Sequence, residues 1–158
     1  MAKQENDQDE LYRARAAALR LLARREHSRQ ELALKMRQRK FAGDVIRSVL
    51  DEYEDRSWLD DHRFAEVYAR QRMELGYGPL RIQGELQQRG IHFTPDNMQE
   101  MTEEDWCRNA IRTRDKRYGL TDLSGDWDEK VRQARFLSRR GFSASQVERA
   151  LDEVIPAE

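Results

Sequence analysis

The chain has 158 residues and a formal net charge of −1, and 38% of its residues are hydrophobic while 37% are charged. No apolar run approaches the roughly 20 residues that a transmembrane helix needs, which excludes a membrane span. Few β-branched residues and many Ala, Leu, Arg and Gln residues disfavour sheets and favour helices with narrow apolar stripes.

The first residues and the cysteine content indicate a cellular setting. Residues 1–10 are polar and acidic where a secretory signal has its apolar segment, so we expect no such signal. A single cysteine, Cys107, allows neither an internal disulfide nor a cysteine-based zinc site. We therefore expect a cytoplasmic protein.

Charge is segregated along the chain although the total is close to zero. Residues 11–48 carry a net charge of +8, residues 49–105 carry −8, and residues 106–140 carry +5. Such blocks favour an anionic partner for the basic regions. The alternative is that arginines and glutamates simply solvate helix surfaces.

The first third of the chain predicts three helices after an acidic tail, residues 1–10, that we expect to be disordered. Apolar spacing predicts a helix over residues 11–26. Ser28 and Glu31 then form a capping-box pattern, which opens a helix that buries Leu32 with Leu34 or Met36. A third helix is expected from residue 43.

The middle of the chain follows the same plan. Residues 57–60 form a second capping-box pattern before a helix. Gly76–Pro79 is an interhelical turn, because Pro79 suits the first turn of the next helix, which stops at Gly90. Thr94 and the proline after it open a short helix.

The last third again predicts three helices. Residues 102–105 begin a helix that breaks at Gly119, and residues 119–126 form a loop. The next helix spans residues 126–139, and residues 143–146 cap the last one.

These elements form an internal repeat. A shift of 50 places Leu32 on Ile82, and a shift of 101 places Leu50 on Leu151. Units of this size bury little apolar surface alone, so neighbouring units are expected to stack. We predict an all-α fold of three tandem three-helix repeats, stacked into an elongated, curved array. The predicted repeats are residues 11–57, 58–101 and 102–158.

No arrangement of residues indicates catalysis. His27, His62 and His92 lie at different predicted helix starts and lack the spacing of metal ligands, so we expect structural roles. Cys107 has no adjacent base and is expected to be a small buried hydrophobic residue. We predict a protein that is not an enzyme and has no cofactor, no metal and no small-molecule substrate.

The aromatic residues divide into core and surface. Trp58 and Trp106 occupy equivalent helix starts and are expected in the core, whereas Trp127 is flanked by acidic residues and is expected to be partly exposed. Tyr77 lies between two glycines and is a candidate exposed contact.

Arginine-rich stretches carry the functional information. Arg132, Arg135 and Arg139 recur at three- and four-residue spacing and therefore share one helix face. Arginines in such a row suit phosphates or carboxylates, through bidentate hydrogen bonds.

Four stretches of the sequence resemble the RecX family. They are Arg25–Leu32 (REHSRQEL), Trp58–Ala65 (WLDDHRFA), Gly76–Ile82 (GYGPLRI) and Arg135–Phe142 (RFLSRRGF). The resemblance implies a cytoplasmic, non-catalytic regulator that binds the filament of RecA protein on single-stranded DNA. It also implies that RecA ATP hydrolysis, recombination and strand exchange are mostly inhibited, in the regulation of DNA repair.

We expect the basic blocks to contact this filament, with weak direct contact to DNA as a further expectation. The candidate contact residues are Arg24, Arg25, Arg29, Lys35, Arg39, Tyr77, Arg81, Arg132, Arg139 and Arg140. Two other classes stay open: a protein that acts by binding DNA itself, because three-helix units with arginine-rich helices can enter a groove, and an enzyme.

Overall fold

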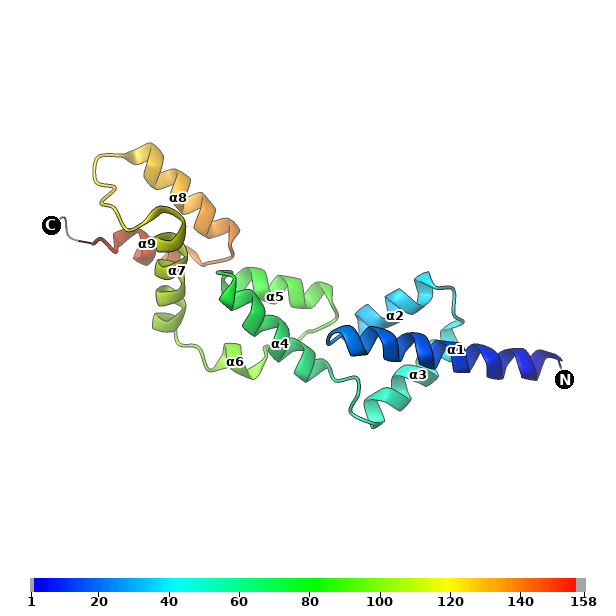
Figure 1. Cartoon of the computed structure of the whole chain (residues 1–158). Coiled ribbons are helices and arrows are strands. Elements are labelled where there is room, and N and C mark those ends of the chain that lie inside the picture. Colours follow the sequence, from blue (N-terminus) through cyan, green and yellow to red (C-terminus); the bar gives the residue numbers. More distant parts are fainter. Residues whose placement is uncertain (1, 156–158) are drawn as a thin grey trace. The chain divides into compact units, whose positions relative to one another are not determined.

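The computed structural model describes residues 2–155, and the regular secondary structure of this range is entirely helical (Figure 1). Its helices are α1 (Ala2–Arg24), α2 (Arg29–Gln38), α3 (Gly43–Asp55), α4 (Asp61–Glu74), α5 (Pro79–Gln88), α6 (Asp96–Gln99), α7 (Glu103–Tyr118), α8 (Trp127–Arg139) and α9 (Ala144–Asp152). Taken three at a time, they confirm the predicted all-α fold of three tandem three-helix repeats. None of the described helices is long and apolar enough to cross a membrane.

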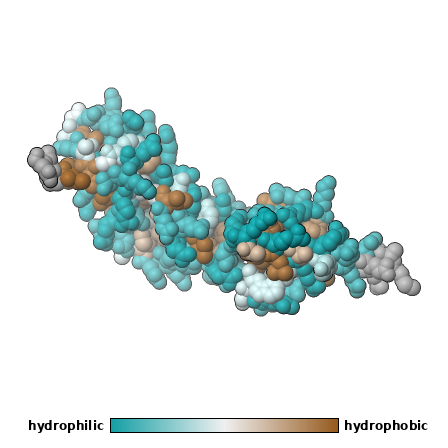
Figure 2. All heavy atoms as spheres, viewed as in Figure 1, coloured by the Kyte–Doolittle hydropathy of each residue, from teal (hydrophilic) through white to brown (hydrophobic). Residues whose placement is uncertain are grey.

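The chain divides into two compact units that do not coincide with the three repeats. The first unit extends through Val67 and includes Gln88–His92, and the second comprises Tyr68–Gln87 and the chain from Phe93 onward. The second repeat therefore contributes to both units. Figure 2 shows that the face in view is largely hydrophilic, as expected for amphipathic helices that each bury one stripe.

The three helices of the first repeat enclose one apolar core. Small side chains of α1, among them Ala14 and Ala18, are fully buried and let the helices approach closely. From α2, Leu32 and Met36 are fully buried, whereas Leu34 is 49% exposed, so Met36 completes the stripe. Each fully buried side chain of this size contributes about 1.5–3 kcal/mol.

Helix starts follow from local capping. The boxes predicted at Ser28 and Ser143 are confirmed, with Glu31 and Gln146 as the respective third residues. The start predicted at Thr102 is a capping box as well. Each box satisfies backbone N–H groups that have no partner inside the helix.

The capping box predicted at residues 57–60 is wrong. Ser57 has a positive φ of 60° in the turn after α3, and α4 begins later, at Asp61. The Asp60 carboxylate accepts hydrogen bonds from the backbone N–H groups of His62 and Arg63, so an aspartate next to the helix takes the capping position. Trp58, expected in the core, is 43% exposed as a result.

In the structure α1 begins at Ala2 and includes most of the acidic segment at residues 1–10. The carboxylate of Glu10 accepts a hydrogen bond from the backbone N–H of Ala42 at 2.8 Å, and Asp9 lies 3.6 Å from Arg13 one turn on. Extending an existing helix needs no new nucleus, so this segment can continue the helix of the first repeat.

The turn after the second helix has the same backbone in every repeat. Lys40, Gly90 and Gly141 stand at equivalent positions and have positive φ values of 68°, 83° and 99°. Glycine adopts this left-handed conformation without strain.

Glycine is required at Gly141 because α5 packs directly against this turn. The backbone N–H of Gly78 donates to the carbonyl of Arg140 at 2.7 Å, and that of Leu80 donates to the carbonyl of Gly141 at 3.0 Å. A Cβ on Gly141 would lie 2.3 Å from the Cβ of Arg81. Backbone-to-backbone contact therefore joins the second repeat to the third inside the second unit.

Replacing Gly141 with alanine is expected to lower the free energy of unfolding by about 2–4 kcal/mol, through backbone strain and steric overlap. The matched control is Gly84→Ala inside α5, where an added Cβ meets nothing within 4 Å. The control is expected to be stabilising by about 0.5–1 kcal/mol, because alanine favours helix over glycine. Urea unfolding of both variants measures the difference, and equal effects would contradict the close packing of α5 against the turn at Gly141.

Candidate interaction surface

Two of the candidate arginines of the first repeat form ion pairs with its own carboxylates. The guanidinium of Arg25 contacts both carboxylate oxygens of Glu31 at 3.1 and 3.2 Å. Arg29 Nη1 lies 2.9 Å from Asp51 and 2.5 Å from Glu54. These charges are already compensated, so their role in the structure is to hold α2 against its neighbours.

Lys35 is also engaged internally. Its Nζ lies 2.8 Å from Nε2 of the buried His27, whose Nδ1 lies 3.0 Å from the carbonyl oxygen of Arg25. Burial lowers the pKa of both side chains, which favours a neutral histidine beside the lysine. The expected structural role of His27 is confirmed. Of the remaining candidates in this repeat, Arg24 and Arg39 are exposed at the ends of α1 and α2.

Tyr77 is half-buried, although the sequence predicts an exposed contact. The guanidinium carbons of Arg72, Arg81 and Arg140 lie 3.8, 4.5 and 4.6 Å from its ring centroid. Arg140 also donates to the carbonyl of Leu75 at 2.9 Å. Tyr77 is therefore a stacking platform for arginines that tie α5 to the end of α8.

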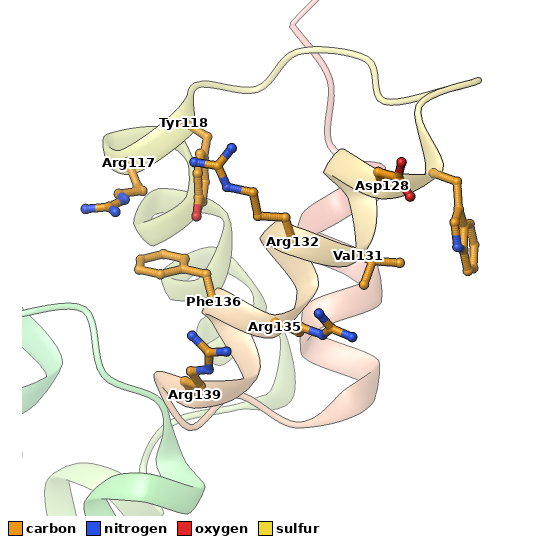
Figure 3. Close-up of a pocket in the computed structure, with 9 residues that line it drawn as sticks. Arg117, Tyr118, Asp128, Val131, Arg132, Arg135, Phe136 and Arg139 are labelled. Carbon is orange, nitrogen blue, oxygen red and sulfur yellow. The ribbon is translucent and has the colours of Figure 1, made fainter.

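The third repeat contains a groove between the end of α7 and the exposed face of α8. The groove has a volume of about 660 Å³ and is lined by Arg117, Tyr118, Trp127, Asp128, Val131, Arg132, Arg135, Phe136 and Arg139. Figure 3 shows Arg132 beside Tyr118, with Phe136 and Arg139 following along α8. The structure thus brings the candidates Arg132 and Arg139 together on one surface.

The arginines of this groove differ from those of the first repeat in their pairing. Within the described residues, Arg117, Arg135 and Arg139 have no ion pair with a carboxylate, and Arg132 has only a 3.5 Å contact with Glu129. The side chain of Arg132 remains 69% exposed. Uncompensated, exposed guanidinium groups keep their charge available to an anionic partner.

A second hollow of about 370 Å³ adjoins the groove and shares two of its lining residues, Arg117 and Phe136. Its other lining residues are Met73, Glu74, Leu75, Gly76, Asn109, Arg112, Thr113, Lys116 and Arg140. Together the two hollows form the surface that we call the α7–α8 basic surface. It combines seven basic side chains with exposed apolar groups.

A buried arginine holds the helices of this surface in place. Arg114, in α7, is fully buried and donates to Gln133 Oε1 of α8 at 2.8 Å. It also donates to the carbonyl oxygens of Ala150 and Glu153 at the end of α9, and of Thr121 in the loop before α8. Burial lowers the pKa of Arg114, but an arginine keeps its proton. The partial negative charge of a helix C-terminus compensates the cation.

The remaining residues that the sequence singles out lie apart from the groove or at its edge. Cys107 and Trp106 are buried as predicted, and burial raises the pKa of the Cys107 thiol. A thiol in this state is a poor nucleophile. His62 and His92 are exposed, and Trp127 is 73% exposed, which confirms the prediction for that tryptophan.

Sequence reasoning missed Arg117 as a member of the candidate site. Its only local signal is its place in the basic last turn of α7. Arg132 follows 15 residues later, on α8, and only folding brings the two arginines to the same groove. Spacing within one helix therefore does not reveal that they belong together.

The fold and the groove together describe a tandem helical-repeat protein with an exposed, arginine-rich surface. Family models of RecX match in three consecutive pieces: the first three-helix domain at residues 14–52, the second at 60–92 and the third at 103–151. The chain belongs to the RecX family of regulatory proteins.

Individual relatives agree with this assignment. Regulatory protein RecX of Halorhodospira halophila is 47% identical over 137 residues, which cover 86% of this chain and 84% of that protein. Regulatory protein RecX of Legionella pneumophila is 36% identical over 141 residues, which cover 87% of this chain and 92% of that protein. The crystal structure of RecX from Lactobacillus salivarius shares the fold, with a TM-score of 0.72 at 22% identity, over 91% of this chain and 97% of that one.

Replacing Arg114 with methionine is expected to lower the free energy of unfolding by about 3 kcal/mol or more, because three backbone carbonyl groups and the side chain of Gln133 lose their donor. Arg112→Met, two residues away on the exposed side of α7, is the matched control and should change stability by less than about 0.5 kcal/mol. Urea unfolding measures both values. If the two variants were equally stable, the buried guanidinium would not be what holds the third repeat together.

Proposed function

We propose that this protein binds the filament of RecA protein on single-stranded DNA and inhibits RecA ATP hydrolysis, recombination and strand exchange, without catalysis of its own. Membership of a family of regulatory proteins supports this function. In this proposal the protein works in the cytoplasm, in the regulation of DNA repair.

The observation that carries the proposal is the row of exposed arginines on the third repeat, of which only Arg132 has an ion pair among the described residues, a 3.5 Å contact with Glu129. A filament of protein on DNA presents both phosphates and carboxylates, and guanidinium groups bind either through bidentate hydrogen bonds. Arg132 and Arg139 are the primary contacts in this proposal, with Arg117 and Arg135 beside them. Exposed charges of one sign also speed encounter with an oppositely charged partner.

The other candidate residues divide by their surroundings. Arg24 and Arg39 are exposed and remain proposed contacts. The six whose side chains are engaged inside the protein are proposed to act mainly by positioning the surface, and these are Arg25, Arg29, Lys35, Tyr77, Arg81 and Arg140.

Inhibition without catalysis follows from binding alone. A protein that binds one state of a filament more tightly than another shifts the filament toward the bound state. A filament held in one state turns over ATP more slowly, and bound protein along the filament obstructs an incoming duplex. No nucleophile, metal or nucleotide loop in this chain is needed for either effect.

The test is RecA's single-stranded-DNA-dependent ATP hydrolysis, with this protein titrated in at fixed salt. The triple variant Arg132→Glu, Arg135→Glu and Arg139→Glu is expected to need a concentration about ten- to hundredfold higher for half-inhibition, because each exposed contact is worth up to about 1 kcal/mol. Arg140 is left intact, since its hydrogen bond to Leu75 is structural.

The control variant makes the same charge change away from the surface, with Arg20, Arg47 and Arg70 replaced by glutamate. All three are exposed, on α1, α3 and α4, and inhibition should stay at the wild-type level. Unchanged inhibition by the triple variant of α8 would contradict the proposal that this surface contacts the filament. Inhibition only at concentrations that coat bare DNA would favour the alternative, a protein that acts by competing for DNA.

A further inference from the structure

The α7–α8 basic surface carries exposed aromatic groups among its arginines. Trp127, at the start of α8, is 73% exposed, although burying so large a ring is favourable. Tyr118 and Phe136 pack edge to face at 5.3 Å between centroids and also line the groove. The tryptophan and this aromatic pair line the same groove and offer apolar ring surface to a ligand.

The cations of the groove follow the same path as the aromatic rings. The guanidinium of Arg117 lies 5.8 Å from the Tyr118 centroid, and that of Arg132 lies 6.0 Å from it on the α8 side. Arg135 and Arg139 continue the row along α8, roughly one and two turns on. Among the described residues that line this groove the sole carboxylate is Asp128, in the first turn of α8, and the neighbouring hollow adds Glu74.

A groove that combines arginines with exposed aromatic rings fits single-stranded nucleic acid better than an acidic polypeptide. An acidic polypeptide would use the guanidinium groups but has no flat group at each residue for the aromatic faces. Single-stranded nucleic acid has a phosphate and a base in every unit, and proteins bind it with a basic groove and aromatic stacking platforms. The neighbouring hollow, with its exposed Leu75 and with Arg112 and Lys116, extends the path for further units.

We propose that the α7–α8 basic surface binds single-stranded nucleic acid directly, with phosphates on Arg117, Arg132, Arg135 and Arg139 and a base stacked on Trp127. The inference deepens the proposed function, because it names the DNA strand as the part of the filament that meets the third repeat. It does not require RecA for binding, so it can be tested on the protein alone.

The experiment measures binding of a fluorescein-labelled oligothymidylate of about 15 nucleotides to the full chain, by anisotropy at several salt concentrations. Four phosphate contacts predict that log K falls with log[salt] with a slope of about −3. The variant Arg132→Gln, Arg135→Gln and Arg139→Gln is expected to reduce the slope by about 2. The control Arg20→Gln, Arg47→Gln and Arg70→Gln should leave affinity and slope unchanged.

Stacking is tested separately from charge. Trp127→Ala is expected to weaken binding about tenfold with the same salt slope, and Trp127→Phe should restore most of the affinity. Oligothymidylate binding that the α8 variants leave unchanged would overturn the proposal. Poly-glutamate of equal charge competing as well as the oligonucleotide would also overturn it, and would assign the surface to an acidic protein segment.

The same variants in the RecA ATPase assay separate this inference from the proposed function. Oligonucleotide binding by wild type without inhibition of RecA would remove the proposed function and leave the nucleic-acid site. Full inhibition of RecA by a wild-type chain that binds no oligonucleotide would overturn the nucleic-acid site and leave the proposed function standing.

Discussion

The third repeat depends on one buried cation. Arg114 has no carboxylate partner among the described residues and instead donates to backbone carbonyl groups at the end of α9 and in the loop before α8, and to Gln133. Leaving such a cation unpaired would be costly, so these acceptors fix where the loop and both helices lie around α7. The positions of α7 and α8, and therefore the groove between them, thus depend on Arg114, which does not itself line the groove.

Arginine serves two purposes in this protein, and its partners distinguish them. In the first unit, Arg25 and Arg29 are paired with carboxylates of their own repeat, and Arg63 pairs with Glu26 at 2.6 Å. In the third repeat, the arginines along α8 face water. A chain whose net charge is only −1 can still present a cationic surface when the acidic residues are placed elsewhere. The positions of the arginines that lack carboxylate partners, and not the net charge of the chain, therefore determine where the surface is cationic.

The sequence predicted most of the fold because its signals are local. The capping boxes at Ser28 and Ser143 and the breaks at Gly76 and Gly119 act within a few residues, and the structure confirms them. The candidate site was harder to predict from the sequence, because the exposure of a side chain and its ion pairs depend on packing between distant segments of the chain. Tyr77 looks exposed between two glycines, yet three arginines from two repeats cover it.

The central claim is that the α7–α8 basic surface of the third repeat meets the filament. Site-specific photo-crosslinking tests it most directly, with a benzophenone amino acid placed at Arg135 in the groove or at Arg47 on α3. With RecA assembled on single-stranded DNA, we expect filament adducts from position 135 and none from position 47. Adducts from position 47 alone would contradict it.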